Sequence, residues 1–120
     1  MNDRRKKGLE KEISRIIGML LLTEVKNEKI KNLVSVQKAE LTKDGRYLDL
    51  TFSILDLKNN VNKEKILEEL EKLKGFFRKS IGSQLTVRFV PEIRIHLDDS
   101  TEYGIKIASI LNEIKQKESE

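Results

Sequence analysis

The apolar residues of this chain change their spacing from that of a helix to that of a strand and back again. They recur every three or four positions from Leu9 to Leu21, which predicts an amphipathic helix over about residues 3–25. From Leu48 to Ile54 they alternate with polar residues, which is typical of a strand with one buried face. A chain with both periods is expected to build a sheet that helices cover.

The segment before that strand predicts its hairpin partner. Its apolar alternation slips by one residue near Gln37 and Lys38, which indicates a β-bulge. The Asp44-Gly45 pair that follows is a strong hairpin signal, because glycine accepts a positive φ. Residues 32–55 are therefore predicted to form one antiparallel hairpin.

A second helix and a third strand are predicted next. Apolar residues at helical spacing favour a helix over about residues 62–85, with a kink at Ser80-Ile81-Gly82. Alternation over residues 92–97 predicts a strand, and Pro91 marks its start because proline cannot donate to a central ladder. A last helix is predicted from about Asp99.

The element order α-β-β-α-kink-α-β-α predicts the fold class. It is a single α+β domain over residues 1–115, with a three-stranded sheet, helices packed on one face and a frayed polar tail at 116–120. The absence of cysteine excludes disulfides and thiolate sites and fits a reducing cytoplasm. The longest apolar run, Met19–Leu22, is far shorter than the ~20 residues of a membrane span, so we expect no membrane contact.

Groups suited to catalysis or metal binding are sparse. His96 is the only histidine, and it falls on the outward phase of the third strand. Asp98, Asp99 and Glu102 could bind a hard cation, but they lie where the last helix needs capping. Phosphate-loop and dinucleotide motifs are absent. We therefore expect no enzyme activity, no metal and no cofactor.

Positive charge is concentrated in two segments. Between residues 72 and 94, six positive residues stand against one negative residue, whereas the whole chain carries only +4. A basic face attracts polyanions, and the planar arginine side chain pairs with phosphate and stacks on bases. We expect these residues to converge along a groove between helix and strand and to bind RNA. They are Lys72, Lys74, Arg78, Lys79, Arg88 and Arg94, with Arg4, Arg5, Lys6 and Lys7 in support.

Other interpretations of this charge remain open. Charge runs are usually solvated surface, and Arg78 and Arg88 could pair with carboxylates such as Glu71 and Glu92. A different class of function is a protein–protein module that docks through its sheet face or first helix without RNA. Because Tyr47 and Tyr103 are the candidate surface aromatics, we expect limited base stacking and recognition mainly of shape and backbone.

Three blocks of the sequence resemble the ribosome-binding factor A family. They are GFFRKSIG at 75–82, LTVRFVPEI at 85–93 and LDDSTEYG at 97–104, and the arginine-rich first helix is also similar. The resemblance implies a type II KH fold that lacks the Gly-x-x-Gly loop. In the family a small-x-Gly kink replaces this loop, here Ser80-Ile81-Gly82, which adds Ser80 and Gly82 to the predicted RNA contacts.

The resemblance also implies a function. Members of the family are bacterial, non-catalytic maturation factors that bind the immature 30S ribosomal subunit. They aid processing of the 5′ end of the 16S rRNA from its precursor, often in cold adaptation. We expect the same partners here, with the protein acting as a monomer in the cytoplasm.

Overall fold

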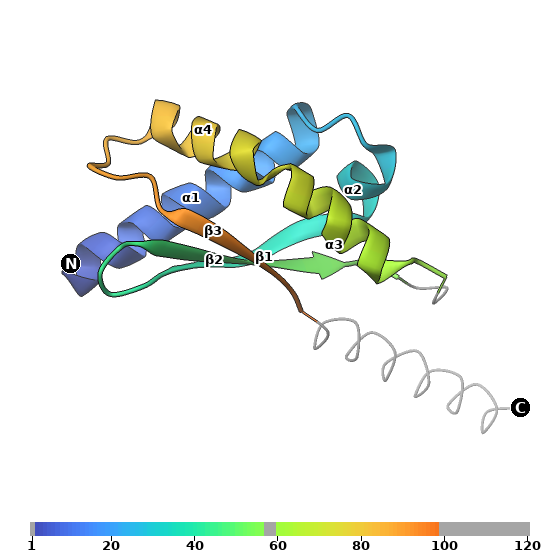
Figure 1. Cartoon of the computed structure of the whole chain (residues 1–120), viewed down its shortest axis with the longest axis horizontal. Helices are drawn as coiled ribbons and strands as arrows, with labels where there is room; N and C mark the ends of the chain where they lie inside the picture. Colours follow the sequence, from blue (N-terminus) through green and yellow to red (C-terminus); the bar gives the residue numbers. More distant parts are fainter. Residues whose placement is uncertain (1, 57–59, 99–120) are drawn as a thin grey trace, which may run out of the picture.

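The computed structural model describes residues 2–56 and 60–98. They form a three-stranded sheet with helices along one face, which confirms the predicted α+β class (Figure 1). The element order agrees with the predicted one as far as the third strand, with one extra short helix. In chain order the elements are α1 (Asp3–Thr23), α2 (Glu28–Leu33), β1 (Val34–Leu41), β2 (Tyr47–Ile54), α3 (Lys63–Lys72), α4 (Lys74–Gln84) and β3 (Glu92–Leu97).

The sheet has the strand order β1-β2-β3, with β2 in the centre. Strand β1 is antiparallel to β2, and β3 is parallel to β2. The pairing of β1 with β2 shifts register between Val36 and Lys38, which confirms the predicted β-bulge. Gly45 has a φ of 72° in the connecting turn, a conformation that favours glycine, so the hairpin prediction is also confirmed.

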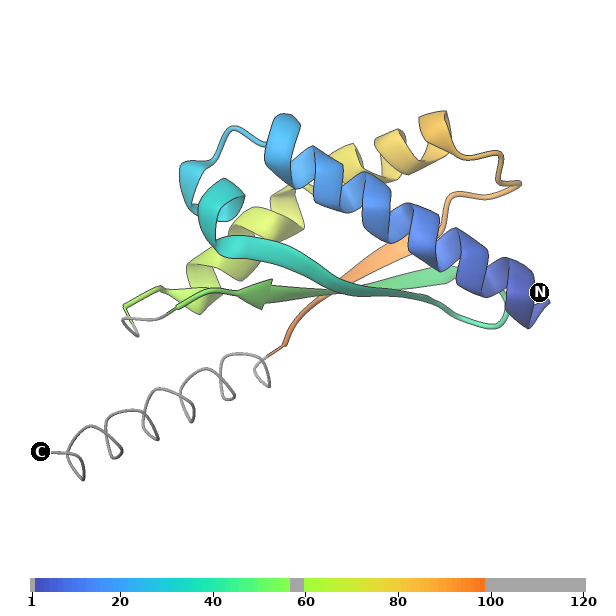
Figure 2. The same cartoon turned by 180° about the vertical axis from the view of Figure 1, so that it is seen from behind.

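The hydrophobic core lies between the sheet and its helices. Figures 1 and 2 view the molecule from opposite sides, and both show α1, α3 and α4 on the same side of the sheet. The inward side chains of β2, which include Leu48, Leu50 and Phe52, are fully buried. Phe77 of α4 stacks on Phe52 with 6.2 Å between the ring centroids. Burial of each such side chain stabilises the fold by about 1.5–3 kcal/mol, and it fixes which strand residues face outward.

Helix α2 was not predicted from the sequence. The side chain of Asn27 caps it by accepting hydrogen bonds from the backbone N–H groups of Lys29 and Ile30. Ile30 is the helix's one buried residue. A six-residue helix with one buried side chain is too short to produce a hydrophobic period, so the sequence pattern contained no signal for it.

The predicted kink at Ser80-Ile81-Gly82 is wrong, because the break between helices lies at Leu73. There the backbone N–H donates to the Leu70 carbonyl at 3.0 Å, and α4 then continues unbroken to Gln84. Ile81 is fully buried, which holds this part of α4 against the core. A Cβ atom on Gly82 would lie 3.0 Å from Cγ2 of Val90. This glycine therefore allows the chain before β3 to pack close to the helix.

The third strand begins directly after Pro91, and Ile93 and Ile95 face the core as the alternation predicts. The last predicted helix, including Asp99 and Glu102, and the polar tail at 116–120 lie outside the described residues. Within the described part of the chain, no helix has the length and apolar character needed to cross a membrane.

Candidate nucleic-acid interface

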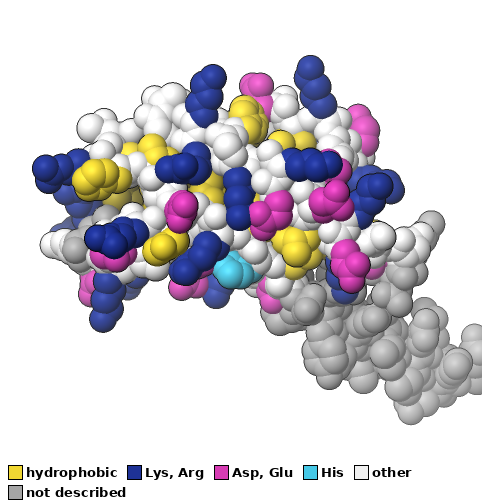
Figure 3. Space-filling view, in the orientation of Figure 1, with side chains coloured by type: hydrophobic (Ala, Val, Ile, Leu, Met, Phe, Trp, Pro, Cys, Tyr) yellow, Lys and Arg dark blue, Asp and Glu magenta, His cyan; other side chains and the backbone are white. Residues whose placement is uncertain are grey.

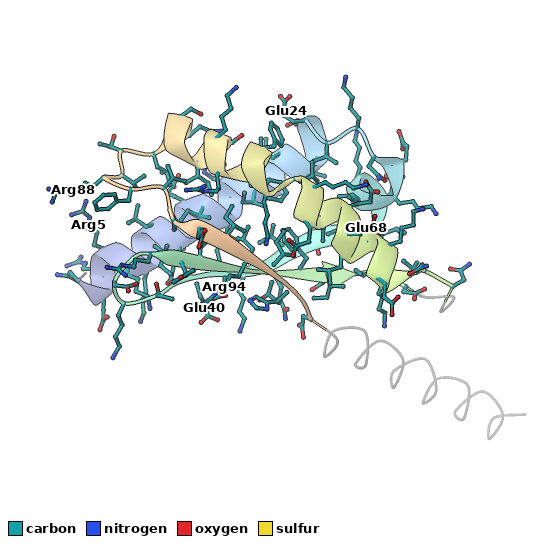
Figure 4. All side chains as sticks on the ribbon, in the orientation of Figure 1. Arg5, Glu24, Glu40, Glu68, Arg88 and Arg94 are labelled. Atoms are coloured by element: carbon teal, nitrogen blue, oxygen red, sulfur yellow. The ribbon has the colours of Figure 1, made fainter. Side chains whose placement is uncertain are left out.

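Three segments that are distant in the sequence meet at one end of the molecule. They are the start of α1, the turn between β1 and β2, and the loop from Leu85 to Pro91 that joins α4 to β3. Arg5 and Arg88 line a shared cavity there, and Figure 4 shows the two side chains close together. Arg46 of the turn lines a second hollow with Phe89. We call this region the hairpin end, meaning Arg5, Arg46, Arg88 and Phe89 with the two cavities that they line.

The start of α1 is tied to the sheet by a carboxylate. Glu10 Oε2 accepts a 2.7 Å hydrogen bond from the backbone N–H of Leu41, at the end of β1. The same oxygen lies 3.8 Å from Lys6 Nζ. Four successive residues of a helix point in four different directions, at 3.6 residues per turn. Of the basic residues 4–7, Arg5 is the one that lines the cavity.

The loop before β3 is held by Arg78. Its Nε atom donates to the Pro91 carbonyl and its Nη2 atom to the Val90 carbonyl, both at 3.2 Å. The backbone N–H of Glu92 also donates to the Arg46 carbonyl at 2.8 Å, which joins the loop to the hairpin turn. Arg78 was predicted to contact RNA, but in this geometry its guanidinium group positions the loop.

The described residues give neither Arg78 nor Arg88 a carboxylate partner, so the pairing with Glu71 or Glu92 that the sequence left open is not found. Instead, the Arg88 guanidinium lies 5.9 Å from the centroid of the Phe89 ring. That distance is near the outer limit of a cation–π contact, about 6 Å. Arg88 is therefore lightly held and open to an anionic ligand.

The lysines at the junction of α3 and α4 are paired with acidic neighbours on α3. Lys72 Nζ lies 3.4 Å from Glu69 Oε1, and Lys74 Nζ lies 2.6 Å from Glu71 Oε2. Exposed pairs of this kind contribute only about 0–1 kcal/mol to stability, so they can open for a ligand. Lys79, on the exposed side of α4, has no carboxylate partner among residues 2–56 and 60–98.

Arg94 does not join the hairpin end. Strand alternation places it on the face of the sheet opposite the helices, where it forms two 2.8 Å hydrogen bonds to Asp49 (Figure 4). His96 Nε2 lies 2.8 Å from Asp49 Oδ1, and the Arg94 guanidinium lies 4.6 Å from the Tyr47 ring centroid. The hydrogen bond from Arg94 lowers the pKa of Asp49, and the His96 contact lowers it further. The expectation that the whole basic stretch lines one groove is therefore wrong for Arg94.

Two residues of the hairpin end were missed at the level of sequence. Arg46 directly follows the hairpin glycine, and its neighbour Tyr47 pairs with Glu92 of β3. Knowledge of the strand order would therefore have placed Arg46 beside the loop before β3. Phe89 is 75% exposed. No sequence pattern signals that exposure, because phenylalanine is among the residues most often found buried.

Comparison with known proteins assigns the chain to a family. The family model described as Ribosome-binding factor A matches residues 5–111. The chain belongs to the ribosome-binding factor A family. A relative in Fusobacterium nucleatum named Ribosome-binding factor A is 47% identical over 119 residues, covering 96% of this chain and 99% of that one.

Solved structures of the ribosome-binding factor A family share the fold. A Thermotoga maritima protein is 33% identical with a TM-score of 0.66, covering 80% of this chain and 89% of its own. A Thermus thermophilus ribosome-binding factor A model, fitted into a map of a 30S complex of that protein, is 16% identical with a TM-score of 0.60, covering 77% and 93%. The KH-like fold implied by the sequence resemblance is thus confirmed.

Proposed function

We propose that this protein binds the small (30S) ribosomal subunit through 16S rRNA and that the hairpin end makes the contact. The observation that carries the site is two arginines without a carboxylate partner in the described part of the chain, beside the turn in which Asp44 pairs with Arg46. The described residues supply no carboxylate partner for Arg5 or Arg88, although both arginines line one cavity. Clustered cations attract phosphates, and binding releases the counterions of those phosphates. Membership of the ribosome-binding factor A family supports the ribosomal partner.

We further propose that the bound particle is the immature subunit and that binding aids maturation of the 5′ end of the 16S rRNA from its precursor. A protein that only binds can favour one RNA arrangement through its higher affinity for that arrangement. Low temperature slows the escape of RNA from misfolded states, so such a factor becomes more useful in the cold. In this proposal the protein acts in the cytoplasm, as a monomer and without catalysis.

The test is co-sedimentation with immature small subunits. The variant Arg5→Glu/Lys79→Glu/Arg88→Glu reverses three exposed cations at or near the hairpin end. Its control, Lys26→Glu/Lys29→Glu/Lys31→Glu, makes the same change in net charge around α2, at the other end of α1 (Figure 1). We expect the first variant to lose binding and the control to keep it. Equal binding by both variants would contradict the proposed site.

A protein–protein docking module is the competing function. RNA contacts predict binding that weakens steeply as salt rises, and binding that disappears when the particles are treated with nuclease. A partner that is retained after nuclease treatment, with affinity that barely depends on salt, would favour docking through protein.

A further inference from the structure

Phe89 stands exposed in a loop that is firmly anchored. Its side chain is 75% accessible, more than any other large apolar side chain that the structure describes. The two carbonyls that follow it, those of Val90 and Pro91, both accept hydrogen bonds from Arg78. The ring is therefore presented to solvent by an ordered backbone, an arrangement that packing of the fold does not require. Contiguous apolar surface with a polar rim commonly marks a binding site.

The ring borders two hollows at the hairpin end. One has a volume of about 250 Å³, with an apolar floor that includes Leu9 and Ile81, and with Arg5 and Arg88 among its lining residues. The other, of about 550 Å³, lies between Phe89 and Arg46. Figure 3 shows a hydrophobic patch at this end of the molecule with Lys and Arg side chains beside it. An apolar surface bordered by cations fits a ligand that has a flat apolar face and a negative charge.

We propose that Phe89 stacks on an unpaired base of single-stranded RNA while Arg5 and Arg88 bind the adjoining phosphates. This inference rests on the proposed function and specifies that the hairpin end binds single-stranded RNA. Every nucleobase has a π-face, so stacking on an aromatic ring binds single strands with little sequence preference. The bases of a duplex are already stacked on one another, which leaves their faces out of reach of a surface ring.

The charges around the ring favour a base over a phosphate inside the cavity. Asp44 lines both hollows, and its carboxylate repels phosphate. Its Oδ1 atom accepts hydrogen bonds from the Thr42 hydroxyl and the Arg46 backbone N–H, which fixes the carboxylate in the turn. A carboxylate at such a rim can accept a hydrogen bond from an exocyclic amino group of a base. The phosphates then lie outside the cavity. Arg88 can turn toward them, because its contact with the Phe89 ring is long and therefore weak.

This assignment replaces the expectation that base stacking is limited. Of the two aromatics considered from the sequence, Tyr47 already has the Arg94 guanidinium 4.6 Å from its ring centroid, and Tyr103 lies outside the described residues. Phe89 is the most exposed aromatic side chain among the described residues, and it lies beside Arg5 and Arg88, which have no carboxylate partner there.

The chain contains no tryptophan, so Phe89→Trp places a single indole reporter at the site. We expect its fluorescence to be quenched by a short single-stranded RNA and to change little with a blunt duplex of the same composition. In an anisotropy titration, Phe89→Leu should weaken single-strand binding roughly ten- to hundredfold. The slope of log affinity against log salt should stay unchanged, because no phosphate contact is removed. The control Leu22→Ala alters an exposed apolar residue on α1 and should bind as the wild type does.

The outcomes separate this inference from the proposed function. If the wild type sediments with small subunits while Phe89→Leu binds RNA normally and the indole is not quenched, stacking is refuted and ribosome binding stands. If the indole responds to intact particles but to no RNA, including the rRNA extracted from them, the patch contacts protein and the proposal is overturned. Quenching by single strands without co-sedimentation would support stacking and refute the ribosomal role. Should Phe89→Leu fail to fold, the Phe89→Trp fluorescence still decides the question.

Discussion

Replacement of Arg78 by alanine is expected to weaken RNA binding without removing a phosphate contact. The two hydrogen bonds from its guanidinium to the carbonyls of Val90 and Pro91 hold the loop that carries Arg88 and Phe89. Without them, the loop must be ordered when RNA binds, and the free energy of that ordering is subtracted from the binding free energy.

The size of the effect follows from the geometry. A hydrogen bond from a charged donor contributes about 1.5–3 kcal/mol when it is well formed. Both bonds here measure 3.2 Å and lie partly in solvent, so we expect them together to contribute about 1–2 kcal/mol. The free energy of unfolding of Arg78→Ala should fall by that amount in urea titrations. If the whole loss appears in binding, the RNA affinity falls about five- to thirtyfold.

The salt dependence of binding distinguishes an anchor from a phosphate contact. Arg78→Ala should leave the slope of log affinity against log salt unchanged, whereas Arg88→Ala should reduce it by about 0.7 for a single strand. Arg78→Lys keeps the charge but replaces the two guanidinium nitrogens that bond the two carbonyls by one ammonium group, so it should lose part of the stability as well. A variant Arg78→Ala with wild-type stability and a reduced slope would refute the anchoring role.

Further predictions concern the packing and ion pairs that shape the site. Gly82→Ala should lower the free energy of unfolding although alanine is the better helix former, because the Val90 side chain lies 3.0 Å from the new Cβ position. In a double-mutant cycle with Val90→Ala, the coupling energy should reach about 0.5 kcal/mol or more, and simple additivity would contradict the close contact. Glu10→Ala should cost about 1–3 kcal/mol, measured in urea, because a backbone N–H at the end of β1 loses its acceptor. The hydrogen bond from Arg94 holds the pKa of Asp49 below its usual value. The ion pair therefore stabilises the fold above about pH 4, and this stabilisation is lost as pH falls through the lowered pKa of Asp49. The stability difference between the wild type and Asp49→Asn should therefore shrink on acidification, and a constant difference would contradict the ion pair.

Much of the fold could be predicted from local pattern. The alternation along β2 determined which face is buried, the phase slip near Lys38 marked the bulge, and Gly45 marked the turn. Each of these signals acts over a few neighbouring residues. The helix break was misplaced because glycine is compatible with both a kink and a close contact, and the position of Val90 in space decides between them at Gly82.

The site was harder to predict because its geometry depends on long-range contacts. Arg94 shares the outward phase of His96 in the strand pattern, but its partner Asp49 is 45 residues away and is brought beside it by the parallel pairing of β2 with β3. In the same way, the carbonyls that Arg78 binds lie 12 and 13 residues further along the chain. A count of basic residues finds the charge but cannot separate cations used within the fold from those left for a ligand.

The most direct test of the RNA interface is site-specific crosslinking to immature small subunits. A photoreactive p-azidophenylalanine in place of exposed Thr86 puts the probe in the loop at the hairpin end, and the same residue in place of exposed Asn32 puts it on α2. The interface proposed here predicts crosslinks from position 86 to unpaired nucleotides of the 16S rRNA and few from position 32. Crosslinks to RNA from position 32 alone, or crosslinks from position 86 only to ribosomal proteins, would contradict it.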